Sequence, residues 1–173
     1  MKKIIFTALT FVGFATVNAQ TVTLNVRLKP VQTLIVNTAQ KTVNLDYNTR
    51  EDYANGVTSL NADHLTVYST GGFQVKIKSG NSALVNGSKT IQANTIQVKA
   101  SAGTDPVNGA QYSPFSPLSA TETTLVTSSA GVVDKKISVE YKGASANAYL
   151  DNYVTGQNVS VYTSELTYTI ISQ

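Results

Sequence analysis

The chain has 173 residues, of which 13 are basic and 10 are acidic, and it contains neither cysteine nor tryptophan. Because there is no cysteine, the sequence excludes disulfides, a thiolate metal site, a thiol nucleophile and a lipoprotein anchor. The net charge of +3 is not concentrated in a long run of like charges, so the composition does not indicate a nucleic-acid-binding surface.

Residues 1–19 have the three parts of a secretory signal peptide. Two lysines precede a mostly apolar stretch, residues 4–17, that is too short to span a bilayer comfortably, and Val17-Asn18-Ala19 fits the small-x-small cleavage rule. We therefore expect an exported protein, in the periplasm, on the cell surface or outside the cell, with a mature domain over residues 20–173 and no further membrane-spanning segment. Losing two of the 13 basic residues leaves eleven against ten acidic ones, which again argues against a nucleic-acid partner.

The first mature segment, Thr21 to Leu28, alternates between apolar and polar residues as a half-buried strand does. Its apolar positions are Val22, Leu24, Val26 and Leu28. We expect an ordinary first strand of the domain's own sheet. The alternative is a strand donated to the next subunit of a polymer, because an extension with this spacing can fill a groove in a neighbour.

The next strands are expected after Pro30, which interrupts the ladder because it cannot donate a hydrogen bond. Residues 31–37 and 42–47 both carry apolar residues at strand spacing, and we predict a strand in each. Residues 48–56 are predicted to be a polar connection.

A hairpin is predicted around Thr70-Gly71-Gly72. This turn separates a strand over residues 64–69 from a strand over residues 73–78, and Gly-Gly suits the primed turns of hairpins, which need positive φ.

The rest of the chain continues as short β-patterns between turns. Strands are predicted over residues 90–100, 121–127, 135–142 and 158–172, a long loop over residues 102–119, and at most one short helical turn within residues 145–153. Nine or ten short strands of this kind predict an all-β fold, an antiparallel β-sandwich of immunoglobulin-like or pilin-like type.

No arrangement of residues points to catalysis. His64 is the only histidine, no G-x-S-x-G motif occurs, and Asp63 would face away from His64 on a strand. We expect His64 to lie on the surface at a strand start, and we predict no catalytic residue, no cofactor and no zinc site. Asp46, Glu51 and Asp52 lie close in sequence, which leaves a calcium site as a minor alternative to solvated loop carboxylates.

Two motifs resemble those of WxL-type cell-surface domains, and similar β-sandwiches occur in spore-coat-U-like and pilin-like secreted proteins. Gly71-Gly72-Phe73-Gln74-Val75 opens one strand, and residues 162–170 close the chain with Tyr168 two positions before Ile170. Phe73 and Tyr168 would replace the family's tryptophans, and Val75 and Ile170 its leucines. The resemblance implies a non-enzymatic envelope protein that attaches to cell-wall polymers or assembles with other surface proteins.

Tyrosine is the one abundant aromatic residue, with nine copies. Tyr149 and Tyr153 flank a loop and could form a binding surface, although capping of the sandwich ends is the more ordinary role. We therefore predict a surface structural or adhesion protein that acts through protein contacts or self-assembly; the alternative is an envelope polysaccharide-binding module. The candidate interaction residues are Val22, Leu24, Val26, Leu28, Phe73, Tyr149, Tyr153 and Tyr168.

Overall fold

The computed structural model describes residues 19–173, so the predicted signal peptide lies almost wholly outside the described residues. These residues form eleven strands, one six-residue helix and three short 3-10 turns. The strands are β1 (Gln32–Val36), β2 (Thr58–Ser69), β3 (Phe73–Ser79), β4 (Ala83–Asn86), β5 (Lys89–Gln92), β6 (Gln97–Ala102), β7 (Gln111–Tyr112), β8 (Ser116–Pro117), β9 (Thr123–Ser128), β10 (Val132–Lys142) and β11 (Leu166–Ser172). The helical elements are η1 (Thr38–Gln40), α1 (Arg50–Asn55), η2 (Ala93–Thr95) and η3 (Leu150–Asn152).

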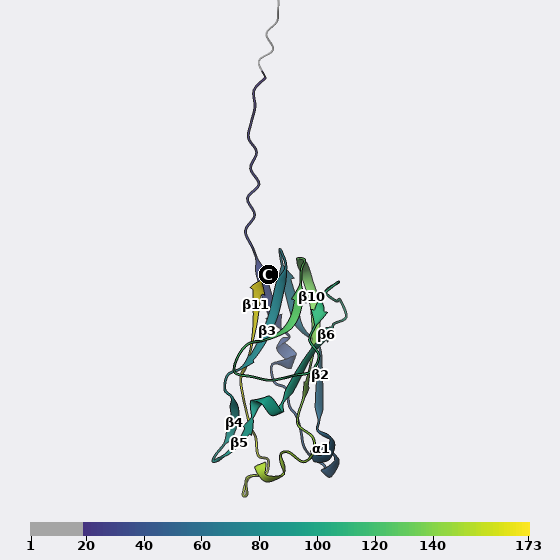
Figure 1. The fold of residues 1–173 in the computed structure, drawn as a ribbon, viewed down its shortest axis with the longest axis vertical. Helices are drawn as coiled ribbons and strands as arrows, with labels where there is room; N and C mark the ends of the chain where they lie inside the picture. Colours follow the sequence, from purple (N-terminus) through teal and green to yellow (C-terminus); the bar gives the residue numbers. More distant parts are fainter. Residues whose placement is uncertain (1–18) are drawn as a thin grey trace, which may run out of the picture.

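The strands form two antiparallel sheets and one separate hairpin, as Figure 1 shows. The first sheet has the order β1-β2-β10-β6-β8, the second has the order β11-β3-β9-β7, and β4 and β5 form a two-stranded sheet. The all-β prediction is therefore confirmed, with a sandwich-like arrangement. The edge strands β1 and β11 lie side by side along one margin of the molecule.

One core lies between the two sheets. The residues that are almost fully buried come from both sheets: Leu65, Val67, Val98, Ile137 and Val139 from the first, and Phe73, Val75, Ile77, Leu125 and Val126 from the second. Most of them alternate with more exposed residues, because successive side chains of a strand point to opposite faces.

The predicted hairpin at Thr70-Gly71-Gly72 is wrong. β2 pairs with β1 and β10, whereas β3 pairs with β11 and β9, so this turn carries the chain from one sheet to the other. Neither glycine has the positive φ that a primed hairpin turn requires. A true two-residue hairpin turn occurs at Gly87-Ser88, where Gly87 has a φ of 60° and Asn86 pairs with Lys89.

Three predicted strands are incomplete or missing. Residues 21–28 and 42–47 form no strand, and of the predicted strand over residues 158–172 only β11 pairs fully. Before β11, Thr163 makes a single isolated bridge to Val85.

Helix α1 replaces part of the predicted polar connection. Thr49 caps it through a capping box, in which the Thr49 side chain accepts from the Asp52 backbone and the Asp52 carboxylate accepts from the Thr49 backbone. No helix among residues 19–173 has the length and hydrophobicity that crossing a membrane would require.

Candidate functional site

The N-terminal segment, residues 19–31, runs away from the sheets as an extended arm (Figure 1). Its root is fixed where the Val31 N–H donates to Thr70 Oγ1 at 2.9 Å and the Thr70 N–H donates to the Val31 carbonyl at 3.0 Å. Between residues 20 and 30, the described chain forms no hydrogen bond with the sheets. The expectation that residues 21–28 are an ordinary first strand is therefore wrong for this structure.

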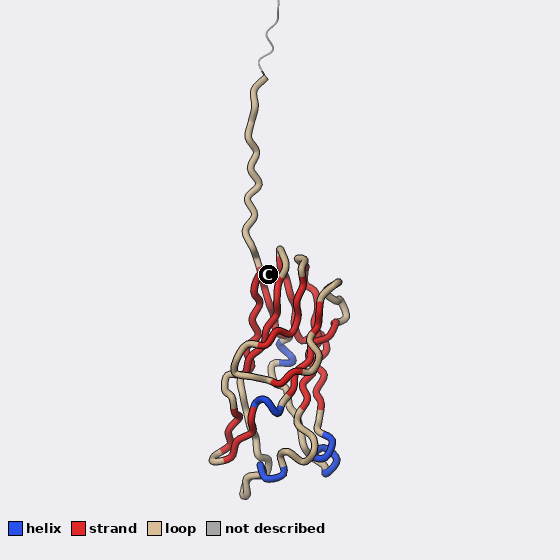
Figure 2. The backbone as a smooth tube through the Cα atoms, in the orientation of Figure 1, coloured by secondary structure: helices blue, strands red, loops and turns tan. Residues whose placement is uncertain are grey.

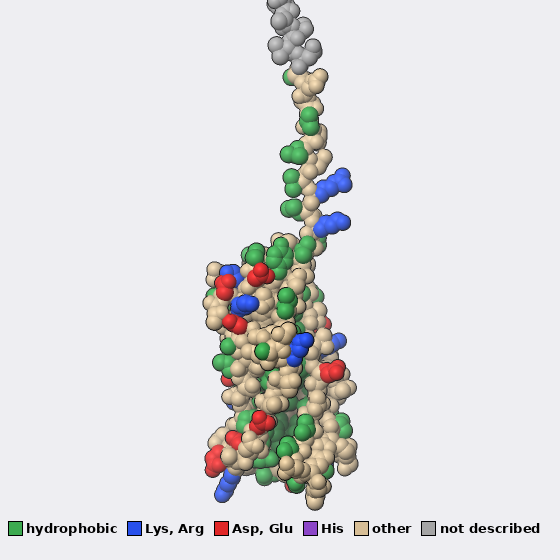
Figure 3. All heavy atoms as spheres, turned by 180° about the vertical axis from the view of Figure 1, so that it is seen from behind, with side chains coloured by type: hydrophobic (Ala, Val, Ile, Leu, Met, Phe, Trp, Pro, Cys, Tyr) green, Lys and Arg blue, Asp and Glu red, His purple; other side chains and the backbone are tan. Residues whose placement is uncertain are grey.

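Four apolar side chains of this segment are almost fully exposed. Val22, Leu24, Val26 and Leu28 have exposed fractions of 92%, 87%, 78% and 89%. Figure 3 shows hydrophobic side chains along one side of the arm and the two basic side chains along the other. The segment thus keeps the two-faced pattern of a strand although it has neither a ladder nor a core to cover.

A second unpaired segment, residues 42–48, follows η1. Its side chains alternate, with Val43, Leu45 and Tyr47 half-buried and the residues between them exposed. Val43 and Leu45 pack against the core. The described backbone of residues 42–47 nevertheless forms no hydrogen bond with another strand. The sequence pattern is that of a strand, but the partner strand is missing.

A third segment, residues 158–165, leads into β11. Val159 and Val161 are 69% and 63% exposed, and Thr163 supplies the only bridge of this stretch within the described chain. In Figure 2 the second and third segments, residues 42–48 and 158–165, run as loops through the lower half of the molecule. Figure 3 shows hydrophobic side chains inside a recess there, which we call the hollow.

The margin formed by the edge strands β1 and β11 is also incompletely covered. Leu34 and Val36 on β1, and Leu166, Tyr168 and Ile170 on β11, pack against the core but stay partly exposed. The outer edges of β1 and β11 have no partner strand in the described chain, so their outward-facing backbone groups are free to pair.

A depression of about 500 Å³ lies at the root of the N-terminal segment. It is formed by Leu28 and Pro30 together with the 70–72 turn and the end of β11. The Gln173 N–H donates to the Gly72 carbonyl at 3.0 Å, which holds the end of β11 beside this root.

His64 is buried, with 2% of its surface exposed, and the expectation of a surface histidine is wrong. It lies within β2 rather than at a strand start, because β2 begins six residues earlier. Its Nδ1 lies 3.1 Å from Gln40 Oε1 and its Nε2 lies 3.4 Å from the Tyr141 hydroxyl. The Tyr141 hydroxyl in turn bonds to the hydroxyl of Tyr168.

This cluster is not a catalytic triad. The Asp63 carboxylate accepts hydrogen bonds from the Thr104 N–H and hydroxyl at 2.8 and 2.6 Å, and these bonds lower the pKa of Asp63. No carboxylate therefore orients His64, whose own pKa is lowered by burial. Burial also raises the pKa of Tyr141 to about 12, so both groups are neutral near pH 7.

The predicted aromatic residues have different surroundings. Phe73 has none of its surface exposed, so it is a core residue and offers no surface contact. Tyr149 packs edge-on against Tyr47, with ring centroids 5.1 Å apart, and its hydroxyl bonds to Thr95 Oγ1 at 2.7 Å. Tyr153 is 52% exposed on the loop after η3.

The two motifs of the family resemblance lie on neighbouring strands. In the β3–β11 ladder, Val75 pairs with Ile170 and Ile77 pairs with Tyr168. Tyr168 contacts His64 with ring centroids 5.5 Å apart, a contact that the sequence pattern gave no signal for.

The acidic group at residues 46–52 does not form a metal site. Asp52 accepts from the Asn48 and Thr49 N–H groups at 2.9 and 2.7 Å, which lowers its pKa and commits it to capping α1. Nowhere in the part of the chain that the structure describes do three His, Asp or Glu side chains cluster as a metal site would require.

Compared with known proteins, the chain matches no family model and no curated protein sequence.

Proposed function

We propose that this chain is a non-enzymatic, exported structural or adhesion subunit that assembles with other copies of itself. In each contact, the N-terminal segment of one copy adds as a strand to the open margin of another. Export is supported by the signal-peptide pattern of residues 1–19, and a surface role by the resemblance to envelope β-sandwich proteins.

The observation that carries this proposal is the exposed apolar row of the N-terminal segment. Burying one such side chain fully contributes about 1.5–3 kcal/mol, so four of them on one face provide a strong drive toward a partner surface. Because the segment is already extended, a partner sheet could add hydrogen bonds along its whole length. Strand addition works in this way, with the backbone giving affinity and alternate side chains giving specificity.

A second copy of the chain offers a matching surface. Residues 42–48 and 158–165 have strand patterns but belong to no ladder, and the hollow with hydrophobic side chains lies in the same half of the molecule (Figure 3). A donated segment in this place would give both unpaired segments a neighbour and cover the half-buried Leu45 and Leu166. The N-terminal segment and residues 42–48 and 158–165 all have strand patterns but belong to no ladder. Pairing between copies would give each of them a neighbouring strand.

The test compares three forms of the mature chain, residues 20–173, by light scattering and electron microscopy. We expect oligomers or filaments from the unchanged chain and monomers from Leu24→Asn/Val26→Asn, which makes the apolar row polar. The control Thr23→Asn/Thr21→Asn changes the opposite face of the same segment and should assemble normally. A monomeric unchanged chain, or normal assembly of Leu24→Asn/Val26→Asn, would contradict the proposal.

A second candidate function, an envelope polysaccharide-binding module, is favoured by one observation only. Leu150, the first residue of η3, and Tyr153, which follows η3, are 59% and 52% exposed, and an exposed tyrosine ring can stack on a sugar. Retention on purified cell wall that is lost in a folded Tyr153→Ala variant would support this function. Phe73→Ala is unsuitable for such a test, because Phe73 is a core residue.

A further inference from the structure

Donation of the N-terminal segment would bring two copies into contact at their ends. Val31 is bonded to Thr70, and it lies three positions after Leu28, the last apolar residue of the row. Three Cα-to-Cα steps span at most about 11 Å. A copy that holds Leu28 must therefore touch the end from which the segment leaves, which we call the proximal end.

The charged side chains of the segment itself are all of one sign. Arg27 and Lys29 are the only charged residues between positions 20 and 31, and both are basic. Arg27 lies on the polar face, so it stays at the surface when the apolar row is buried. Near this end the half-buried Lys135 is already paired with Asp105 at 2.6 Å, and Asp134 beside it is exposed.

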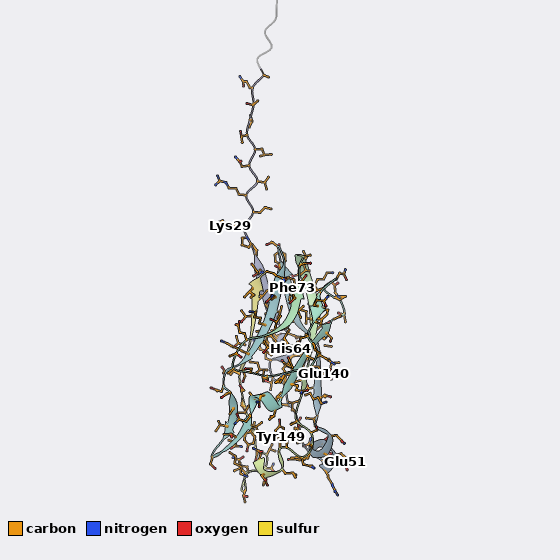
Figure 4. All side chains as sticks on the ribbon, viewed as in Figure 1. Lys29, Glu51, His64, Phe73, Glu140 and Tyr149 are labelled. Atoms are coloured by element: carbon orange, nitrogen blue, oxygen red, sulfur yellow. The ribbon has the colours of Figure 1, made fainter. Side chains whose placement is uncertain are left out.

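The opposite, distal end carries a small excess of acidic side chains. It includes residues 44–58, 83–92 and 142–157, which hold four carboxylates and three basic side chains. The carboxylates are those of Asp46, Glu51, Asp52 and Asp151, and the basic residues are Arg50, Lys89 and Lys142. Figure 4 shows Lys29 and Glu51 at opposite ends of the molecule.

Two of these carboxylates are best placed to receive a partner. Asp46 is exposed on residues 42–48, and Glu51 is exposed on α1. Neither forms an ion pair with a residue of the described chain, whereas Asp52 is committed to its cap.

We propose, resting on the assembly function above, that Arg27 and Lys29 of one copy contact Asp46 and Glu51 of the next. Copies then join from the proximal end to the distal end, in one direction. A contact between two proximal ends would oppose basic roots, and the root of the acceptor's own segment already occupies that end. Contact between like charges is unfavourable. This charge pattern therefore disfavours the contact between two proximal ends and selects one direction of assembly.

The charge pairing changes mainly the rate and the direction of assembly. Exposed ion pairs contribute little to stability, but complementary charge raises the association rate and fixes orientation. The resulting contact joins two different surfaces, which gives open chains rather than closed dimers.

Cross-linking tests the direction of the contact. Because the chain has no native cysteine, an introduced cysteine is the single thiol of its chain. A chain with Lys29→Cys is mixed with a chain carrying Glu51→Cys, and a short bis-maleimide reagent is added. We expect a cross-linked pair of chains. The matched control replaces Glu51→Cys by Val133→Cys, a residue that is 65% exposed near the proximal end, and should give little product. Dominant 29–133 or 29–29 products would overturn the proposal.

Charge reversal tests the mechanism independently. At low salt, Arg27→Glu/Lys29→Glu should slow assembly by about tenfold or more, since steering by charge changes association rates on this scale. Adding Asp46→Lys/Glu51→Lys to the same chain should restore the rate. Lys76→Glu/Lys78→Glu makes the same charge change on β3, away from both ends, and should leave the rate unchanged.

These experiments separate the two proposals. If the unchanged chain assembles but charge reversal has no effect, end-to-end charge pairing is wrong and donation of the segment still stands. If the unchanged chain stays monomeric, both proposals are overturned.

Discussion

At the scale of single residues, the amide of Gln40 determines the tautomer of His64. The Gln40 side-chain N–H donates to the Ala62 carbonyl at 3.0 Å, so its Oε1 faces His64 as an acceptor. His64 must then carry its proton on Nδ1 and accept at Nε2 from the Tyr141 hydroxyl. A second proton on His64 would displace that hydroxyl and place a charge in the core.

The first prediction concerns the stability of the protein against pH. Because burial lowers the pKa of His64 in the folded chain, the unfolded chain takes up a proton below about pH 6.5 that the folded chain does not. Stability should therefore be complete above pH 6.5 and fall by up to about 1.4 kcal/mol per pH unit below it. Urea unfolding between pH 5 and 8 measures this slope.

The control for that experiment is His64→Gln, which should remove the slope between pH 5 and 6.5 even if it lowers stability overall. The lowered pKa values of Asp52 and Asp63 act elsewhere, because their contribution is lost only as the pH falls below about 3.8. An equal slope in both proteins would show that His64 is not the titrating group.

The second prediction separates a core role from a ligand-binding role for Phe73. Phe73→Ala removes a side chain that has none of its surface exposed, and such a deletion costs about 3–5 kcal/mol. Tyr153→Ala, at an exposed position, should cost less than about 1 kcal/mol. Equilibrium urea unfolding gives both values, and an unchanged stability of Phe73→Ala would contradict the placement of Phe73.

At the scale of elements, alternation identified which residues adopt extended backbone but not which of them find a partner. Residues 31–37, 121–127 and 135–142 were correctly predicted as strands, and β1, β9 and β10 pair there. Residues 42–47 have the same pattern and no ladder. Pairing depends on which segments meet in space, and a single sequence carries no such information at this range.

The turn at Gly71-Gly72 shows a second limit. Glycine permits positive φ but does not require it, so Gly-Gly is compatible with a hairpin and with a crossing between sheets. At Gly72 the reason for glycine is space, because a Cβ there would lie 3.1 Å from the carbonyl oxygens of Ser128 and Ser129.

The candidate site was only partly predictable for the same reason. The apolar row of residues 22–28 was visible in the sequence, whereas its exposure depends on the absence of a partner strand. His64 and Tyr47 gave no usable signal, because their burial follows from contacts with Tyr141 and Tyr149 that are distant in sequence.

The third prediction belongs to these unpaired segments. In monomers, peptides over residues 42–48 and 158–165 should exchange their amide hydrogens much faster than peptides over β2 and β10, since few of their N–H groups are bonded. On assembly both should become protected if a donated strand lies between them. Hydrogen–deuterium exchange with mass spectrometry measures both states.

The matched control in that experiment is Leu24→Asn/Val26→Asn, in which residues 42–48 should stay fast at the same protein concentration. Protection of β1 alone, with residues 42–48 unchanged, would place the donated strand elsewhere.

At the scale of the whole molecule, donor and acceptor lie on different parts of one chain. The N-terminal segment leaves at one end, and the hollow lies in the opposite half (Figures 1 and 3). When the segment of one copy fills the hollow of a second copy, the second copy's segment and the first copy's hollow remain free. Unless a ring closes, assembly therefore continues as an open chain.

The fourth prediction follows from that asymmetry. A copy truncated to residues 29–173 keeps the acceptor surface but has nothing to donate, so each one incorporated ends a chain. With one truncated copy in ten, the mean length should fall to about ten copies, because every open chain then ends at its first non-donating member. Electron microscopy of mixtures at several ratios gives the lengths. Asp46→Lys/Glu51→Lys copies, which donate but accept poorly, should shorten chains from the other end. If association were through non-specific hydrophobic contact instead, length would not follow the truncated fraction, since such a cluster has no unique growing end.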